Sequence, residues 1–334
     1  MKKSSKQQMR DIGEREFLSQ ISHFVDESEL DFNDDASAIK LSSGELLVIN
    51  IDMLVNKTDV LPEMTFRQMG KKAVTMAVSD IIAKGVQPLV CLASIGFPAE
   101  TEVVKAKDVI TGIREQCDYY NVLYLGGDLN ESSDIVVDVV SLGVSKDKKI
   151  IPRKGARNGD LLFSTGLFGY TSLGFRILLE NLIVPSELKK KALLSVYEPI
   201  ARIDLLHLLQ NFPIIICMDS SDGLLVTLSD LSKLNQMGID VTYVPLSESI
   251  RDFSKTKGIN PLELAFTGGE EFEMIFAIAL DKKDEFLEIT KNLGFSIYCI
   301  GSFNNSHKEI KIKDELFEKY ELPKDGFEHF RINN

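Results

Sequence analysis

The stretch PIIICMDSSDGL, residues 213–224, joins a run of apolar side chains to a cluster of carboxylates and hydroxyls. Residues 213–217 are as apolar as a buried strand, and a helical pattern begins at about Leu224. Asp219 and Asp222 therefore lie where a buried strand is expected to end and a helix to begin. Because open α/β sheets bind ligands at the carboxyl ends of their strands, this stretch predicts an α/β fold with a ligand site beside it.

Short apolar runs alternate with helical patterns along most of the chain, which indicates an α/β or α+β fold. The 334 residues exceed the ~250–300 at which a single hydrophobic core stops growing. The polar, turn-rich segment 146–160 is typical of a domain boundary. We therefore predict an N-terminal domain of residues 1–150 and a C-terminal α/β domain of residues 151–334. Strands are expected at residues 46–51, 88–95, 122–125, 135–144, 161–164, 214–217, 239–244, 273–279 and 295–300, and helices at 66–84, 102–120, within 171–210 and from 224.

Composition and charge narrow the function classes. The net charge of −12 disfavours nucleic acid as a partner, since phosphate backbones are bound by basic surfaces. The four cysteines form no CxxC pair, so buried free thiols are a simpler interpretation than a zinc site or disulfides. No run approaches ~18 uncharged apolar residues. The basic start also lacks the apolar core of a signal peptide. We therefore expect no membrane partner and a cytoplasmic location.

Several aspartates stand in positions that solubility alone does not explain. They precede an expected apolar turn, close an expected strand, interrupt an apolar helix, or follow a strand. Each has a plainer explanation, because Asp222 could cap a helix, Asp34 could cap a turn, and Asp80 could face solvent. Together they predict a cleft in which a cation relieves the repulsion between carboxylates. The aspartates in question are Asp34, Asp35, Asp52, Asp80, Asp128, Asp219 and Asp222.

Mg²⁺ is the cation that such oxygen ligands favour, and proteins usually hold it with a few carboxylates and substrate phosphates. The four histidines are scattered and form no HExxH motif. The phosphate-binding motif GxxxxGK[ST] is absent, because Thr65 stands where the first glycine before Gly70 and Lys71 belongs. The HRD and DFG motifs of protein kinases are also absent. An ATP-using protein with this sequence must therefore have another architecture.

The order of seven motifs resembles thiamine-monophosphate kinase, particularly its archaeal members. This family belongs to a superfamily with aminoimidazole ribonucleotide synthetase and selenophosphate synthetase. The resemblance runs from about Asp11 to residue 330, and it implies an N-terminal sheet that pairs across a homodimer and a C-terminal α/β domain. It also implies transfer of the γ-phosphoryl group of ATP to thiamine phosphate. The motifs are NDDASAI (33–39), NIDMLV (50–55), MAVSDIIAKGVQP (76–88), LGGD (125–128), RKGARNGD (153–160), MDSSDGL (218–224) and FTGGEEFEM (266–274).

The resemblance also implies roles for individual residues. No residue is assigned as a catalytic base, because the acceptor phosphate is already an anion. Phe327 could stack on a cationic thiazolium ring, although it could equally anchor the C-terminal segment. The implied Mg²⁺ ligands are Asp34, Asp52, Asp80, Asp128, Asp219 and Asp222. The implied ATP contacts are Gly127, Asp128, Arg153 and Ser221, and the implied thiamine phosphate contacts are Asp59, Glu270 and Phe327.

The sequence departs from the family pattern at several of these motifs. Asn33 replaces a glycine, and Asn50 and Ile51 replace two threonines, so a hydroxyl is lost at Ile51. Asp59 stands where many bacterial members have a histidine, and GGEEFE replaces GGEDYE. Two alternatives therefore stay open, namely another ATP-using enzyme of the superfamily and a catalytically inactive nucleotide-binding dimer. Selenophosphate synthetase is disfavoured, because no cysteine lies near the N-terminus.

Overall fold

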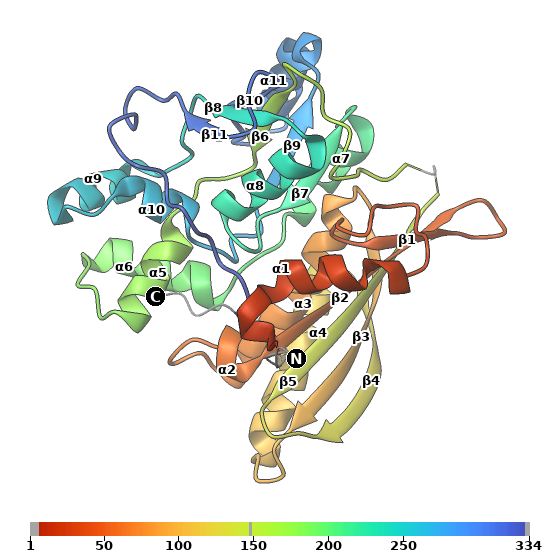
Figure 1. The fold of residues 1–334 in the computed structure, drawn as a ribbon. Helices are drawn as coiled ribbons and strands as arrows, with labels where there is room; N and C mark the ends of the chain where they lie inside the picture. The colour runs from red at the N-terminus through yellow and green to blue at the C-terminus, as the bar shows by residue number, and fades with distance from the viewer. Residues whose placement is uncertain (1–6, 147–148, 331–334) are drawn as a thin grey trace, which may run out of the picture.

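The computed structural model of the protein describes residues 7–146 and 149–330. Residues 1–6 of the basic start, residues 147–148 of the predicted boundary segment and residues 331–334 lie outside the described residues. Two β-sheets lie at the centres of the two halves of the molecule, one within residues 37–145 and the other within residues 161–312 (Figure 1). This arrangement confirms the mixed α/β class. The division into independent domains at residue 150 stays a prediction.

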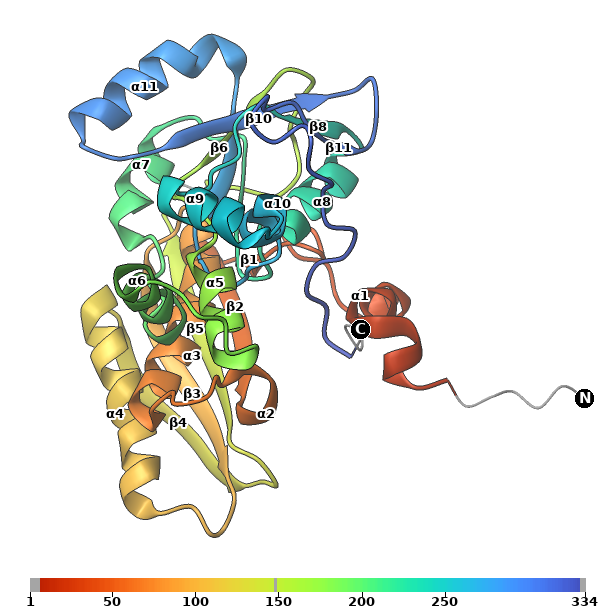
Figure 2. The same ribbon diagram turned by 90° about the vertical axis from the view of Figure 1, so that its left-hand side faces the viewer.

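The N-terminal sheet has five strands in the order β1-β2-β5-β3-β4. Only β3 and β4 pair in parallel, whereas the other neighbours are antiparallel. The helices α3 and α4 pack together and cover one face of this sheet (Figure 2). The elements of this half are α1 (Met9–Ile21), η1 (Ser22–Phe24), β1 (Ser37–Lys40), β2 (Leu46–Val55), α2 (Asn56–Asp59), α3 (Phe66–Ala83), β3 (Pro88–Phe97), α4 (Val103–Tyr120), β4 (Leu123–Glu131) and β5 (Val136–Ser145).

The sequence of α3 explains how it begins and how closely it approaches α4. Thr65 accepts a hydrogen bond from the backbone N–H of Gln68, and the Gln68 side chain accepts one from Thr65, which forms a capping box. Gly70 lies against the backbone of α4, where a Cβ atom would come within 2.1 Å of the Val109 carbonyl oxygen. A larger residue at this position would force the two helices apart. This packing fixes the face of α3 that carries Asp80.

The C-terminal sheet has six strands in the order β11-β8-β10-β6-β9-β7. Its central pairs are antiparallel, and β11 and β8 are parallel. No helix in the described part of the chain is long and apolar enough to cross a membrane. The elements of this half are β6 (Leu161–Ser164), α5 (Tyr170–Leu179), α6 (Ser186–Tyr197), η2 (Ile203–Leu205), α7 (Leu206–Asn211), β7 (Ile216–Asp219), α8 (Leu224–Asn235), β8 (Gly238–Val241), α9 (Glu248–Lys257), α10 (Pro261–Phe266), β9 (Met274–Ile278), η3 (Leu280–Lys282), α11 (Lys283–Asn292), β10 (Tyr298–Asn304) and β11 (Ile310–Ile312).

Three local expectations about the aspartates are wrong. Asp52 lies inside β2, which continues to Val55, and therefore does not close a strand. Asp128 also lies inside a strand, because β4 continues through Gly126 and Gly127. Asp34 and Asp35 precede the strand β1, whereas an apolar turn was expected there. For Asp52 and Asp128, the pairing of the strand with its neighbours in the sheet extends it beyond the apolar run that the sequence shows.

Candidate active site

A cavity of about 660 Å³ opens between the two halves of the molecule. Its walls come from the segment before β1, from β2, α2 and α3, and from the loops that follow β7 and α10. The helix α1 and the C-terminal segment lie along its rim, where Leu18 and Phe327 both line the cavity. Most residues that the resemblance assigns to binding are on these walls, namely Asp34, Asp52, Asp59, Asp80, Arg153, Asp219, Ser221, Asp222, Glu270 and Phe327.

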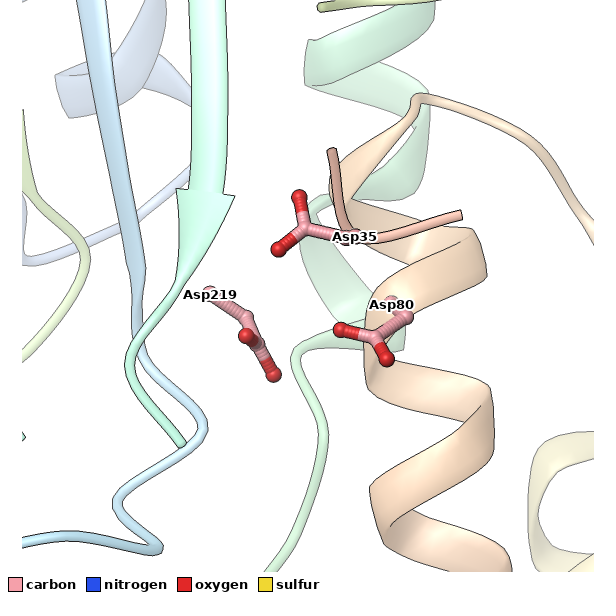
Figure 3. Close-up of side chains that lie close together, drawn as sticks. All are labelled: Asp35, Asp80 and Asp219. Carbon is pink, nitrogen blue, oxygen red and sulfur yellow. The ribbon is translucent and has the colours of Figure 1, made fainter. Parts of the chain in front are cut away.

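Three carboxylates from separate elements converge on the inner wall of this cavity. Asp35 comes from the segment before β1, Asp80 from α3 and Asp219 from the end of β7 (Figure 3). Each offers an oxygen atom, and these atoms all lie within 4.8 Å of one another. The donor set contains oxygen alone, which fits a hard divalent cation such as Mg²⁺. We call Asp35, Asp80 and Asp219 the carboxylate triad.

Hydrogen bonds from neighbouring side chains hold Asp80 and Asp219 of the carboxylate triad in place. One oxygen of Asp219 receives no hydrogen bond. The Ser79 hydroxyl donates to Asp219 Oδ2 at 2.6 Å, and the Asn50 amide donates to Asp80 Oδ2 at 2.6 Å. Asp219 Oδ1 is buried and accepts no hydrogen bond in the structure. A buried carboxylate oxygen without a partner is costly, and a bound cation would relieve that cost. Asn50, a departure from the family pattern, thus has a place in the site.

Burial and mutual repulsion make most of these aspartates hard to ionise. Burial and the nearby carboxylate of Asp35 raise the pKa of Asp219 to about 7. Burial, with Asp219 and Asp52 close by, also raises the pKa of Asp80 well above its ordinary value. The pKa of Asp52 and that of Asp222 are each raised to about 6, chiefly by burial. Such shifts are expected where carboxylates gather without a cation between them.

The paired aspartates are neutralised by two cationic side chains. The Lys84 ammonium contacts Asp34 Oδ1 and lies 2.5 Å from Asp35 Oδ2. The Arg153 guanidinium donates from Nε to Asp35 Oδ1 at 2.8 Å, and the Arg153 backbone N–H donates to Asp34 Oδ2 at 2.9 Å. Burial alone would raise the pKa of Asp35, but Arg153 and Lys84 hold it below its ordinary value. Arg153, which we expected to contact nucleotide, is therefore engaged by this pair.

A second buried lysine of α3, Lys72, pairs with a residue of the cavity wall. The Lys72 side chain is 1% exposed, and its ammonium forms an ion pair with Glu270 Oε1. The same ammonium donates to the backbone carbonyl of Asp59 at 2.6 Å. Glu270 Oε2 is buried without a hydrogen-bond partner, while the Glu270 backbone N–H donates to the Ser221 carbonyl at 2.6 Å. Lys72 therefore connects α3 with the end of α2, which carries Asp59, and with the loop that carries Glu270.

The remaining predicted residues on the cavity wall have structural partners of their own. The Asp59 carboxylate accepts from the backbone N–H of Val55 at 2.7 Å. Asp222 does not cap α8, whose N-cap residue is Gly223, and its carboxylate lies 3.6 Å from the Arg15 guanidinium instead. Phe327 is 39% exposed at the cavity rim. Its ring is therefore accessible and is not a core anchor.

Gly127 and Asp128 are not among the described residues that line the cavity. Gly127 lies in the register row Asp52–Val139–Ala93–Gly127, which places it three strands, or about 14 Å, from Asp52. A Cβ atom on Gly127 would lie 1.8 Å from the Ala93 carbonyl oxygen, so the close approach of two strands explains this glycine. Asp128 is exposed on β4. Its role as a metal ligand therefore stays a prediction.

Sequence reasoning missed two polar residues that organise this site, Lys72 and Lys84. Lys72 lies outside the quoted motifs, Lys84 lies within the motif of residues 76–88 but was given no role, and lysine is ordinarily a surface residue. Asp35 was recognised as one of a pair, yet the metal role was assigned to Asp34, whereas the structure places Asp35 in the carboxylate triad. The apolar spacing around Lys72 and Lys84 within the helical pattern of residues 66–84 was the one signal that could have indicated their burial.

Comparison with known proteins fits this geometry. Residues 33–145 match the family described as AIR synthase related protein, N-terminal domain. The thiamine-monophosphate kinase of Nitrosopumilus maritimus is 33% identical over 307 residues, which cover 90% of this chain and 93% of that protein. This chain belongs to the thiamine-monophosphate kinase family. The family member from Pyrococcus abyssi is 34% identical over 257 residues, which cover 75% of this chain and 78% of that protein.

Solved structures give the same assignment. The structure described as "AaThiL complexed with AMPPCP and TMP" has a TM-score of 0.83 and 25% identity, and the match covers 98% of this chain and 100% of that chain. The structure of Escherichia coli HypE, a hydrogenase maturation protein, has a TM-score of 0.67 at 16% identity, so this likeness concerns the fold alone. The expected family and superfamily are thereby confirmed.

Proposed function

We propose that this protein phosphorylates thiamine phosphate with ATP and Mg²⁺, giving thiamine diphosphate and ADP. The observation that carries the proposal is the carboxylate triad, whose oxygens lie within 4.8 Å of one another on the wall of a cavity open to solvent. Membership of the thiamine-monophosphate kinase family supports the reaction. The relative solved with AMPPCP, an analogue of ATP, and TMP supports both substrates.

We propose Asp35, Asp80 and Asp219 as the core of the Mg²⁺ site, with Asp52 and Asp222 beside it. The unpartnered oxygen of Asp219 and the oxygen-only donor set support this assignment. Mg²⁺ supplies positive charge against the phosphates of both substrates, which is the main requirement of a loose phosphoryl-transfer transition state. The resemblance also assigns ligands at Asp34 and Asp128, and these two remain the least supported by the geometry of the chain.

The chemical step makes few demands on the protein beyond positioning. An oxygen of thiamine phosphate forms a bond to the γ-phosphorus of ATP, and the bond from that phosphorus to the bridging oxygen breaks, so the electron pair leaves with ADP. The attacking phosphate is already ionised, so no proton has to be removed from it. This chain's part is to hold the acceptor at the wall formed by Asp59, Glu270 and Phe327, and the nucleotide near Ser221 and Arg153. Phe327 is exposed enough to stack on the thiazolium ring.

We also propose that the protein is a homodimer. The face of the N-terminal sheet opposite α3 and α4 exposes apolar side chains that a monomer in water would be expected to cover. Met53 is 54% exposed, Leu89 is 44% exposed and Leu125 is 62% exposed. Within the described residues, β4 is an edge strand with no partner on its outer side, and it exposes Leu123, Leu125 and Leu129, which favours association with another chain. The cytoplasmic location stays a prediction from the sequence.

The test is an assay of purified protein with ATP, Mg²⁺ and either thiamine phosphate or thiamine, with separation of the products. We expect thiamine diphosphate from thiamine phosphate, little product from thiamine, and loss of activity in EDTA. Equal turnover of thiamine and thiamine phosphate would contradict the proposal. Binding of Mg²⁺-ATP by calorimetry without any product would instead favour the inactive nucleotide-binding dimer, and product from a different acceptor would favour another enzyme of the superfamily.

A further inference from the structure

Lys84 lies inside the group of acidic side chains that lines the cavity. Its side chain is 0% exposed, and it comes from the end of α3, next to the aspartates before β1. The ammonium contacts Asp34 Oδ1, lies 2.5 Å from Asp35 Oδ2 and donates to the Cys217 carbonyl at 3.1 Å. An ammonium has three N–H donors. Three oxygens surround the ammonium, and Lys84 is therefore a fixed part of the site.

The Asp34 carboxylate has most of its hydrogen-bond acceptor positions occupied by contacts within the protein. Asp34 Oδ1 contacts Lys84 and accepts from the Asp35 backbone N–H at 2.9 Å, and Asp34 Oδ2 accepts from the Arg153 backbone N–H at 2.9 Å. A carboxylate has about four acceptor positions, so three of them are taken. The Asp34 side chain is also 1% exposed. Asp34 is thus already neutralised within the protein.

The other aspartates of the inner wall differ from Asp34 in this respect. Among the described residues, no lysine or arginine forms an ion pair with Asp52, Asp80 or Asp219. Asp219 Oδ1 has no hydrogen-bond partner at all. The inner wall therefore has one part that carries its own cations, around Asp34 and Asp35, and one part that has none. Asp35 belongs to both parts, because it contacts Lys84 and Arg153 and is also a member of the carboxylate triad.

We propose that Lys84 is a resident cation of the active site, which takes the place of a divalent ion at Asp34 and leaves Mg²⁺ to the side of the carboxylate triad formed by Asp80 and Asp219, which have no cationic partner. The inference rests on the proposed use of Mg²⁺ and revises the ligand set that the resemblance implies. A tethered ammonium does not dissociate, so Asp34 and Asp35 stay neutralised before any metal arrives. Arg153 supplies the second fixed charge on Asp35. This chain should therefore bind fewer divalent ions than its aspartates alone would suggest.

The direct test is Lys84→Met, which removes the ammonium and keeps most of the apolar length. The variant should bind one additional Mn²⁺ per chain, counted by electron paramagnetic resonance of free Mn²⁺ without nucleotide. Mg²⁺ should raise its Tm by roughly twice as much as it raises that of wild type. Lys72→Met is the matched control, since Lys72 is also a buried lysine of α3 but pairs with Glu270 outside the triad. Equal Mn²⁺ counts in Lys84→Met and wild type would overturn the inference.

A second variant keeps the inference open to disproof if Lys84→Met does not fold. In Asp34→Asn the lysine is retained and keeps its contact with Asp35, so the Mn²⁺ count should equal that of wild type. Loss of an ion from this variant would show that Asp34 is a metal ligand and would refute the inference. Neither measurement uses catalysis. A protein that binds Mn²⁺ as expected but makes no thiamine diphosphate would count only against the proposed function.

Discussion

Lys72 of α3 and Glu270 of the loop after α10 form an ion pair that connects the two halves of the molecule beside the active-site cavity, which Glu270 lines. The pair fixes one oxygen of Glu270 and leaves the other, Oε2, buried without a partner. A substrate amino group could donate to that oxygen. Because the backbone of Glu270 is held at φ 64 and bonded to Ser221, the carboxylate has little freedom to find another orientation.

Lys72→Met should therefore weaken the binding of thiamine phosphate more than it slows the chemical step. We expect KM for thiamine phosphate to rise by roughly 10-fold, the effect of about 1.4 kcal/mol, with a smaller change in kcat. The neighbouring Lys71→Met is the control, because Lys71 pairs with Glu115 on the exposed side of α3. Steady-state kinetics with each substrate varied in turn measures the effect. A variant with unchanged KM for thiamine phosphate would show that the pair is only structural.

Asp219→Asn tests the carboxylate triad. The substitution removes one negative charge from a cluster of buried carboxylates, so without Mg²⁺ the variant should melt at the same temperature as wild type or higher. The increase in Tm caused by Mg²⁺-ATP should become smaller, because that increase reports binding to the native state. Turnover should fall by roughly 10²-fold or more. A variant that melts lower and keeps its activity would mean that Asp219 is a structural acceptor for Ser79.

The pH dependence of stability should become small or disappear when metal is added. The pKa of Asp219 is raised to about 7 and that of Asp52 to about 6, so the folded protein keeps protons that the unfolded chain releases near pH 4. The resulting stability is complete below about pH 4 and is lost as the pH rises through about 6 and 7. Asp35 acts in the opposite direction, since its pKa is lowered.

In EDTA, the free energy of unfolding should therefore fall as the pH rises from about 5 to about 7.5, by an amount on the order of a few kcal/mol. With saturating Mg²⁺ the fall should be small or absent, because the cation binds the ionised carboxylates. Urea titrations across this pH range, with EDTA and with Mg²⁺, give the comparison. The Asp219→Asn variant should show a weaker pH dependence in EDTA than wild type. Identical curves with and without Mg²⁺ would refute the metal assignment.

The homodimer can be tested by light scattering. Wild type should have a mass of about 75 kDa, twice the 37.3 kDa of one chain. Leu92→Asp places a charge on the uncovered sheet face, where Leu92 is 36% exposed, and should shift the mass to that of one chain. Leu293→Asp is the matched control, because Leu293 is 50% exposed at the end of α11. A wild-type monomer at micromolar concentration would contradict the proposed assembly.

The sequence predicts regular elements well where the periodicity is strong. The helix expected at residues 66–84 is α3 at Phe66–Ala83, and the strand expected at residues 161–164 is β6. It fails where contacts between distant segments decide the outcome. Gly126 and Gly127 are typical of a turn, yet β4 continues through them, because a bulge against β3 accommodates the glycines. The ion pair of Lys84 with Asp34 joins residues 50 positions apart, which no local pattern reveals.

The Asp128→Asn variant tests whether Asp128 is a metal ligand, as the resemblance implies. The structure of one chain does not explain this role, because Asp128 is not among the described residues that line the cavity. Asp128 lies opposite Ser94 in the sheet, and Asp138 lies on the other side of Ser94, so these two carboxylates share a register row two strands apart. Burial raises the pKa of Asp138, and burial is also the main reason why the pKa of Asp52 is raised, with a smaller contribution from the charge of Asp138. Asp128 and Asp138 therefore share the uncovered face of the sheet, whereas Asp52 lies in the neighbouring register row with Val139.

If Asp128 binds metal at the end of this row, Asp128→Asn should lose roughly 10²-fold in turnover. It should also melt no lower than wild type in EDTA and gain less Tm from Mg²⁺-ATP. Asparagine keeps the shape of the aspartate side chain and one oxygen that can bind metal. The loss of the negative charge is therefore the main change. A role confined to β4 predicts the reverse, with near-normal turnover and about 1 kcal/mol or less of destabilisation. Melting curves with and without Mg²⁺-ATP, together with turnover, distinguish the two. A destabilised and active variant would remove Asp128 from the metal site.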